Sequence, residues 1–259
     1  MTAMSSTRLI RSSFRSGRAA VWAGMAAIVA LGWIYMVHMN VHMAAMHGMA
    51  AAGEGGHGGL VATFAMWVVM MVAMMLPSVV PTVSVFAMLA GRRSPRSAAR
   101  TTAMFVAGYS LAWIGYCVPA AVAQWELARA ALLTSMGAST SAAVSAAILV
   151  GAGLFQFSGL KNACMSRCRS PLAFLIQEWR DGAAGALVVG LRNGSNCVGC
   201  CWALMAVLFV VGTMNLLWMA LFTLLVCAEK IVPARWRLDA VVGAGFIAWG
   251  AVAAVGAVL

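Results

Sequence analysis

The stretch LVATFAMWVVMMVAMMLPSVVPTVSVFAMLA, residues 60–90, contains no charged side chain. A helix needs about 20 consecutive apolar residues to cross the hydrocarbon core of a bilayer, so this stretch is long enough to do so. Several other uncharged runs in the 259-residue chain approach or exceed that length. The ten-residue segments of alternating polarity that an outer-membrane barrel needs are not found. The sequence therefore predicts an all-α, polytopic bundle of transmembrane helices.

The composition supports a membrane protein and argues against a nucleic-acid partner. Only 9% of the residues are charged and 63% are hydrophobic, whereas a soluble domain carries about 25% charged residues. The net charge is +11, but nearly all 17 Lys and Arg residues lie between apolar runs, and every second gap is rich in them. This is the pattern of the positive-inside rule, so we expect a multi-pass protein of the bacterial inner (cytoplasmic) membrane in contact with its lipid.

The same charge pattern predicts the domain organisation. Residues 1–18 contain four arginines and no acid, so they form a basic cytoplasmic amino-terminal segment, and residues 19–259 form a single transmembrane domain. We expect about seven spans, or six if one short segment is re-entrant, and we expect Pro77 and Pro81 to kink or break the second span. The expected spans cover approximately residues 19–37, 60–90, 101–123, 140–160, 197–211, 216–230 and 238–259.

An outer loop, residues 38–59, is rich in histidine and methionine. Seven of the twelve residues from 38 to 49 are of these two types. Imidazole and thioether together favour copper, and thioether favours Cu(I). The alternative is that methionine only fills space in a membrane helix and histidine lies at the interface, which would explain a single pair but not seven such residues. The candidate ligands in this loop are His38, Met39, His42, Met43, Met46, His47 and Met49.

A methionine ladder runs along the predicted second span. Met66, Met70 and Met74 repeat every four residues and so share one helical face, with Met71 and Met75 beside them. Such a ladder can pass a soft monovalent ion. Adaptable packing against neighbouring helices is the alternative explanation.

The clustered cysteines form a further candidate metal site. Cys164 and Cys168 lie near the start of a predicted cytoplasmic loop, residues 161–197, and Cys197, Cys200 and Cys201 follow at its end. Reduced cytosolic thiols favour metal or redox chemistry over a structural disulfide, and thiolates suit zinc as well as copper. Met205 continues the face of Cys197 and Cys201. Cys117 and Cys227 are isolated, and we interpret them as small apolar fillers.

Basic and acidic residues near these cysteines have two predicted roles. Lys161, Arg167 and Arg169 should favour thiolate over thiol by charge attraction. Glu229 and Lys230 are interpreted as a self-paired anchor at a helix end. The sequence between residues 171 and 195 could span the membrane, re-enter it or lie on it.

The sequence contains none of the motifs of an ATP-driven pump or a hydrolase. There is no P-loop, no Ser–His–Asp arrangement and almost no acid for general acid–base catalysis. We therefore expect a protein without a catalytic site of these kinds.

Four motifs, found in this order, carry a resemblance to a known family. They are MWVVMMVAMMLPSVVP (66–81), GLKNACMSRCRSP (159–171), NCVGCCWALM (196–205) and GTMNLLWMALFTLLVCAEK (212–230). In combination they resemble the family of predicted metal-binding integral membrane proteins. That family is of unknown-function origin and includes copper-chaperone-like membrane proteins of bacterial tyrosinases. The resemblance implies copper handling for an extracytoplasmic copper oxidase or its chaperone. By motif position it implies Met70, Met71, Met74, Met75, Pro77, Lys161, Cys164, Cys168, Cys197, Cys200, Cys201, Met205, Met214, Asn215, Glu229 and Lys230.

Three functional hypotheses follow. The first is a membrane protein that binds Cu(I) and passes it between a thiolate site and the outer loop, for maturation of copper enzymes. The second is a membrane thiol–disulfide oxidoreductase that uses Cys197 and Cys200 with a quinone. The third is a structural assembly subunit whose methionines only pack. Copper is the expected metal, and zinc is the alternative.

Overall fold

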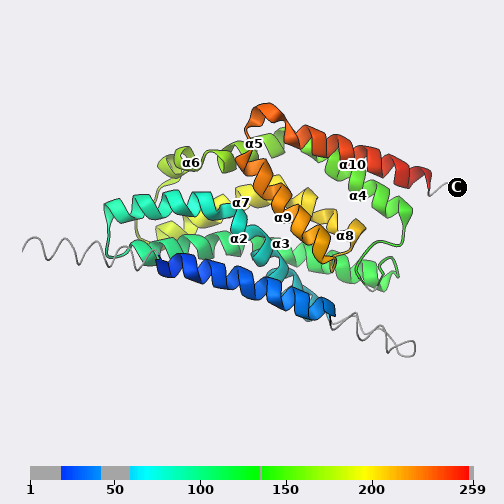
Figure 1. Ribbon diagram of the computed structural model, residues 1–259, viewed down its shortest axis with the longest axis horizontal. Coiled ribbons are helices and arrows are strands. Elements are labelled where there is room, and N and C mark those ends of the chain that lie inside the picture. Colours follow the sequence, from blue (N-terminus) through cyan, green and yellow to red (C-terminus); the bar gives the residue numbers. More distant parts are fainter. Residues whose placement is uncertain (1–18, 42–58, 135, 257–259) are drawn as a thin grey trace, which may run out of the picture.

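The computed structural model describes residues 19–41, 59–134 and 136–256. Within these ranges the chain is almost entirely helical, and the β-structure consists of one isolated bridge between Leu133 and Ser139. The helices run roughly along one common direction and form an elongated bundle (Figure 1). The prediction of an all-α helix bundle is confirmed.

Most of the helices from α2 to α10 follow one another with connections of a few residues, and the connection between α3 and α4, residues 130–141, is longer. The first helix is Ala19–Val41. After it come α2 (Leu60–Arg93), α3 (Ala98–Arg129), α4 (Ala142–Gln156), α5 (Gly159–Arg169), α6 (Pro171–Glu178), α7 (Gly182–Ala206), α8 (Leu208–Val211), α9 (Leu216–Ile231), the 3₁₀ turn η1 (Ala234–Trp236) and α10 (Leu238–Val255).

Five of the described helices are long and apolar enough to cross a membrane, fewer than the expected seven. They are Ala19–Val41, Leu60–Arg93, Ala98–Arg129, Gly182–Val211 and Ala234–Val255. The pair α4 and α5, bent by 61° at its break, makes six if it counts as one broken span. With 16 residues, α9 is only ~24 Å long, shorter than the ~30 Å hydrocarbon core. The smaller of the two expected counts therefore fits better.

The two prolines of α2 do not break it. Pro77 and Pro81 lie inside one continuous helix, Leu60–Arg93. Each proline removes one backbone hydrogen bond, but the neighbouring side chains Leu76, Val79 and Val83 are buried against other helices. Tertiary packing of this kind lets a membrane helix tolerate proline.

The helix α7 begins 15 residues before the span that the sequence predicted. The expected span began near Cys197, whereas α7 begins at Gly182. Polar residues had suggested a loop here, but the structure accommodates them in the helix. Asn193 is buried, and Arg192 forms an ion pair with Glu178. A polar residue can lie inside a membrane helix when neighbouring groups form hydrogen bonds or ion pairs with its side chain.

Small residues bring α3 and α7 into close contact. Gly190 and Gly194, four residues apart on α7, lie against the backbone carbonyls of Phe105 and Tyr109 on α3. On α3, Gly108 in turn faces the backbone of α7, where an added Cβ would lie 2.8 Å from the Leu191 nitrogen. Glycines at this spacing let membrane helices approach closely. This contact fixes Tyr109 beside the middle of α7.

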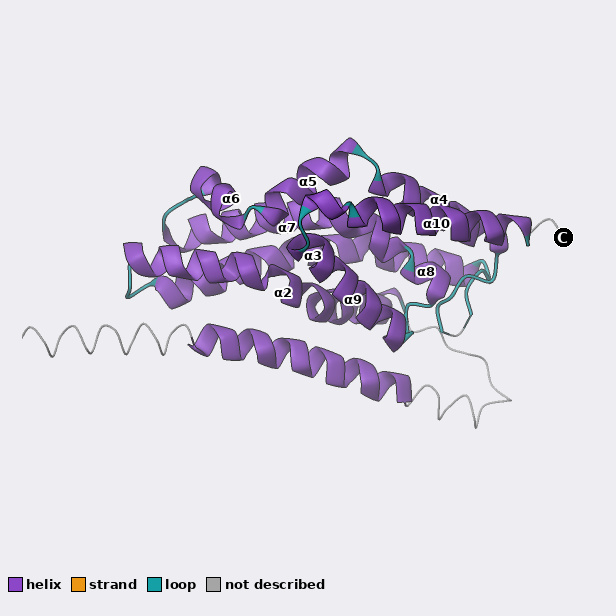
Figure 2. Ribbon diagram, turned by 45° about the horizontal axis from the view of Figure 1, so that its top comes forward, coloured by secondary structure: helices purple, strands orange, loops and turns teal. Residues whose placement is uncertain are grey.

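The first helix runs along the outside of the bundle (Figure 2). It packs on α2 through Gly32, where an added Cβ would lie 2.8 Å from the Ala73 Cβ. Near its carboxyl end, the Asn40 side-chain amide donates a 2.8 Å hydrogen bond to the Met214 carbonyl. Leu31 and Ile34 on the other side are largely exposed, as expected for side chains that face lipid.

Candidate metal centre

Three thiols lie together at the middle of an apolar helix. The sulfur atoms of Cys197, Cys200 and Cys201 are all within 4.8 Å of one another, and the side chains are at most 1% exposed. Cys197 is the sixteenth of the 30 residues of Gly182–Val211. The sequence placed these cysteines at the cytoplasmic end of a short span. The expected start of that span was wrong, because the helix begins 15 residues before Cys197.

The separation of the sulfurs suits a single soft metal ion. A metal–thiolate bond is ~2.3 Å long, so two sulfurs on one ion are at most ~4.6 Å apart. Cys200 and Cys201 are already 3.3 Å apart, and small side-chain rotations would bring all three into range. Thiolates without a neighbouring carboxylate or imidazole select Cu(I), Zn²⁺ or iron–sulfur clusters rather than Mg²⁺ or Ca²⁺.

Cys197 is the member of this group with the most polar neighbours. The Lys230 ammonium of α9 donates to its sulfur at 3.0 Å, and the Tyr109 hydroxyl of α3 lies 3.2 Å from the same sulfur. Lys230 also donates a 2.8 Å hydrogen bond to the Ser78 hydroxyl on α2. An ammonium group in contact with a buried thiol is a compensating charge for its thiolate form. Four helices thus contribute to one polar site inside an apolar bundle.

The backbone of α2 anchors this site. The Met75 carbonyl accepts hydrogen bonds from the Tyr109 hydroxyl at 3.1 Å and from the Ser78 hydroxyl at 2.8 Å. The side chains of Met71, Met74 and Met75 are fully buried on the same helix. The methionine ladder therefore leads along α2 to the residue whose carbonyl holds Tyr109 next to Cys197.

Comparison with protein families assigns the chain. A family model described as PpoB2 copper chaperone matches residues 64–253. The chain belongs to the PpoB2 copper chaperone family. The match confirms the resemblance to copper-chaperone-like proteins and supports a copper-related role. It includes nearly all of α2 to α10 and starts after the first helix. No curated protein and no solved structure matches the chain.

A buried ion pair lies beside the thiols of this PpoB2-family protein. The Lys161 ammonium on α5 donates 2.8 Å hydrogen bonds to both carboxylate oxygens of Glu229 on α9, and it also donates to Gln156. Lys161 and Glu229 are at most 1% exposed. The Arg169 side chain donates to the Glu229 backbone carbonyl at 2.7 Å.

These contacts correct two predictions about charge. Glu229 and Lys230 are not paired with each other, because successive side chains on a helix point in different directions. Glu229 instead holds α5 through Lys161, and Lys230 holds α7 through Cys197. The cation in contact with Cys197 is therefore Lys230, whereas Arg167 lies close enough to Cys164 to act on its thiol as predicted. Lys161 and Arg169 are engaged by Glu229.

The other two clustered cysteines lie on α5, beside the three-thiol group but outside it. Cys164 lies against Gly199 of α7, and a Cβ added at Gly199 would be 2.8 Å from the Cys164 sulfur. Cys168 is close enough to Cys200 to interact with its thiol. Both are half-buried. The two isolated cysteines, Cys117 and Cys227, belong to no cluster of metal-ligand atoms in the described part of the chain.

The remaining predicted ligands are distributed along the first helix, α2 and α7. His38 and Met39 lie on the last turns of the first helix, and Met66 and Met70 face it from α2. Met205 is buried one turn after Cys201. The other predicted ligands of the outer loop lie outside the described residues. They are His42, Met43, Met46, His47 and Met49.

Sequence reasoning missed Tyr109, Ser78 and the role of Lys230. Ser78 and Lys230 lie within two of the family motifs, but no local pattern predicts their contacts, and the three residues meet only because α2, α3, α7 and α9 converge. One signal could have found Tyr109. The Gly190-x-x-x-Gly194 pattern predicts a close helix contact, and Gly108 next to Tyr109 supplies a small residue on the partner helix.

Proposed function

We propose that this copper chaperone family member binds Cu(I) at Cys197, Cys200 and Cys201 and transfers it at or across the bacterial inner membrane for the maturation of copper enzymes. The observation that carries the proposal is the group of three buried sulfurs within 4.8 Å of one another. Buried thiols grouped in this way, in a family named for copper, are best explained as ligands of the transported ion.

The charge of the site does not choose between Cu(I) and Zn²⁺, and copper is proposed here from the family. Three thiolates and one Cu(I) together carry a charge of −2, and a buried charge needs compensation. Lys230 supplies one positive charge in contact with Cys197. Zn²⁺ with three thiolates would carry −1 and would normally take a fourth ligand. No imidazole or carboxylate lies next to the three sulfurs among the described residues, but a fourth thiol, that of Cys168 on α5, lies beside Cys200, so metal analysis distinguishes the two ions.

A route for the ion is supported by the ligands on either side of the thiols. On one side α2 presents Met70 and Met74, whose neutral thioethers bind Cu(I) more weakly than thiolates do. On the other side α5 presents the half-buried Cys164 and Cys168 next to α7. Transfer needs a series of sites of different affinity, and this order of ligands provides one.

The distribution of charge supports the orientation that we propose. Arginines at residues 8–18 and 92–100 place those segments in the cytoplasm. The carboxyl end of the first helix then faces the extracytoplasmic side, and with it the thioether end of the route. The recipient that we propose is an extracytoplasmic copper oxidase or its own chaperone.

Metal analysis of the full-length protein, purified in mild detergent from copper-supplemented cells, tests this function. The test variant replaces all three site cysteines with serine. The matched control is Cys117→Ser, which removes a buried thiol of α3 that belongs to no cluster of metal-ligand atoms. We expect the wild type and the control to retain Cu(I), and the triple variant to lose at least nine-tenths of it.

Four results would reject this function. Equal copper in the wild type and the triple variant would exclude the three thiols as the site. One equivalent of zinc without copper would make the protein a zinc protein. A reversible Cys197–Cys200 disulfide with a bound quinone and no metal would favour the thiol oxidoreductase. If loss of the three thiols changes neither the bound metal nor the copper-enzyme activity of the cell, the protein is a structural subunit.

A further inference from the structure

A small cavity between the first helix, α2 and the start of α9 is lined mainly by thioethers. Its volume is about 20 Å³, which is room for about one water-sized sphere. Tyr35, Thr213 and Leu216 complete its wall, and no charged side chain contributes to it. The six methionines that line it are Met36, Met39, Met66, Met70, Met214 and Met219.

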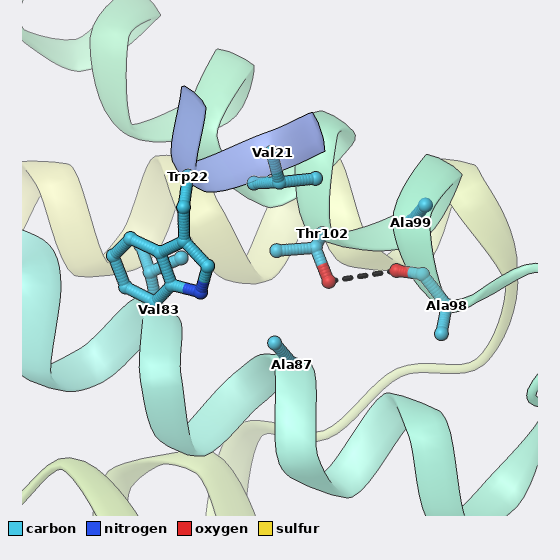
Figure 3. Close-up of a pocket in the computed structure, with 7 residues that line it drawn as sticks. All are labelled: Val21, Trp22, Val83, Ala87, Ala98, Ala99 and Thr102. Carbon is cyan, nitrogen blue, oxygen red and sulfur yellow. Dashed lines mark hydrogen bonds between the residues drawn. The ribbon is translucent and has the colours of Figure 1, made fainter. Parts of the chain in front are cut away.

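A second cavity beside the first helix has no methionine in its wall, so the methionine lining is confined to the first cavity. The cavity of about 10 Å³ near the amino-terminal end of the first helix is lined by Trp22, Val83, Ala87 and other apolar residues (Figure 3). It contains no sulfur, and the hydroxyl of Thr102 already donates a 2.7 Å hydrogen bond to the Ala98 carbonyl. Packing of the first helix on its neighbours therefore does not by itself require methionine.

We propose that the methionine cavity is a second Cu(I) site, separate from the three thiols and made of neutral thioether ligands. This proposal rests on the proposed function and adds a loading site to it. Thioether is a soft ligand that favours Cu(I) over the hard divalent cations. Three of the six methionines suffice for a Cu(I) ion, and the residues come from segments far apart in the chain, 36–39, 66–70 and 214–219.

The neutrality of the cavity makes it suitable for transient binding. A monovalent ion that enters it loses water and gains no opposite charge, so its binding is weaker than at three thiolates. Thr213 adds an oxygen to this wall. Its side chain is fully buried, and its hydroxyl has no hydrogen-bond partner among the described residues. A weak site that precedes a tight one passes its ion onward.

The cavity is connected to the thiols by α2. Met66 and Met70 line the cavity, and the Met75 carbonyl, five residues after Met70, holds Tyr109 beside Cys197. At 1.5 Å per residue, this is an axial distance of only ~7.5 Å. Met74 is fully buried between the two ends of this segment. The hydrogen bond from Asn40 to the Met214 carbonyl keeps the first helix against the cavity wall.

Titration of the metal-free, full-length protein in detergent with Cu(I), against a competing chelator, tests the second site. The test variant replaces four cavity methionines by leucine, which keeps volume and apolarity but removes the sulfur. The control carries the same change at four methionines outside the cavity. The test positions are Met36, Met66, Met214 and Met219, and the control positions are Met25, Met88, Met104 and Met165.

We expect the wild type and the control to bind two equivalents of Cu(I), one weak and one tight. The cavity variant should keep the tight equivalent and bind the weak one at least tenfold less strongly. The Cys197/Cys200/Cys201→Ser variant should keep the weak equivalent alone, and X-ray absorption should then show copper bound to thioether sulfur. That result in the cysteine variant separates the two sites.

The outcomes distinguish the failure of this site from the failure of the proposed function. If the cavity variant binds both equivalents as the wild type does, the second site is rejected and the thiol site stands. If the cysteine variant keeps every equivalent, the proposed function is rejected.

Peroxide footprinting with Ag(I) as the probe gives an answer on the unaltered protein, even if the leucine variant does not fold. Bound Ag(I) should protect Met39, Met66 and Met214 from oxidation but not the exposed Met88. Equal oxidation of all four with and without Ag(I) would overturn the second site.

Discussion

The ammonium nitrogen of Lys230 lies 3.0 Å from the sulfur of Cys197, so a positive charge at the end of α9 meets a thiol at the middle of α7. The preceding residue, Glu229, binds Lys161 of α5. Two successive residues of α9 therefore tie two other helices together at the candidate metal centre. The predictions below test what these contacts do.

Replacing Lys230 by leucine should weaken Cu(I) binding at the three thiols. The change removes the positive charge that balances the thiolates, and a unit charge ~4 Å away is worth up to ~4 kcal/mol at an effective dielectric constant of 20. We expect the affinity for Cu(I) to fall at least tenfold in a chelator competition. Lys230→Arg keeps the charge and should retain most of the affinity. An unchanged affinity in Lys230→Leu would show that the ammonium does not act on the metal.

Breaking the buried Lys161–Glu229 pair should destabilise the fold. In Glu229→Gln the buried ammonium loses its counter-ion, and removal of one partner of a buried pair costs ~3–5 kcal/mol. The melting temperature in detergent should therefore fall clearly. The double variant Lys161→Met/Glu229→Leu should recover most of the loss because neither charge remains. As a control, Asp181→Asn removes an exposed negative charge next to Arg93 but keeps an oxygen that can accept from the Trp179 indole, and it should cost less than ~1 kcal/mol.

Adding one methyl group at Gly194 should disturb both stability and the thiol site. The new Cβ would lie 2.6 Å from the Ala112 Cβ and 2.8 Å from the Tyr109 carbonyl oxygen. Overpacking of this kind costs ~1–3 kcal/mol, and α3 would shift Tyr109 away from Cys197. Gly115→Ala on α3 has nothing within 4 Å of its Cβ and should be neutral or stabilising. Thermal unfolding and Cu(I) titration of both variants measure the difference.

A brief pulse of N-ethylmaleimide on metal-free protein should separate the cysteines by burial. Cys164 and Cys168 are half-buried, whereas the three thiols of the candidate centre are at most 1% exposed. Mass spectrometry should find the α5 cysteines modified first. A membrane-impermeant maleimide should reach them in inside-out vesicles and not in right-side-out ones. Faster modification of Cys197 than of Cys168 would contradict the described packing.

Local sequence patterns predicted the helices, but they predicted some of the bounds poorly. A long apolar run is unfavourable in water, and in a bilayer all of its backbone N–H and C=O groups must be hydrogen-bonded. Such a run therefore forms a helix that packs against other helices or faces lipid. The stretch 60–90 accordingly lies within α2. The start of α7 was not predicted, and of the two outcomes expected for α2, a kink or a break, the break did not occur. Local sequence disfavours a helix at four positions that the structure accommodates: Pro77, Pro81, Arg192 and Asn193. The prolines lie inside α2, Arg192 pairs with Glu178, and Asn193 is buried, so tertiary contacts outweigh the local preference.

The sequence by itself determined the class of the fold and the grouping of Cys197, Cys200 and Cys201, because three thiols within five residues of one helix must lie close together. Only the tertiary structure decided what surrounds them. Lys230 and Tyr109 reach Cys197 from two other helices, and Ser78 of a third helix contacts both of them. The six cavity methionines come from three separate segments. Such contacts depend on helix packing through small residues, such as Gly190 and Gly194, which no local pattern of polarity encodes.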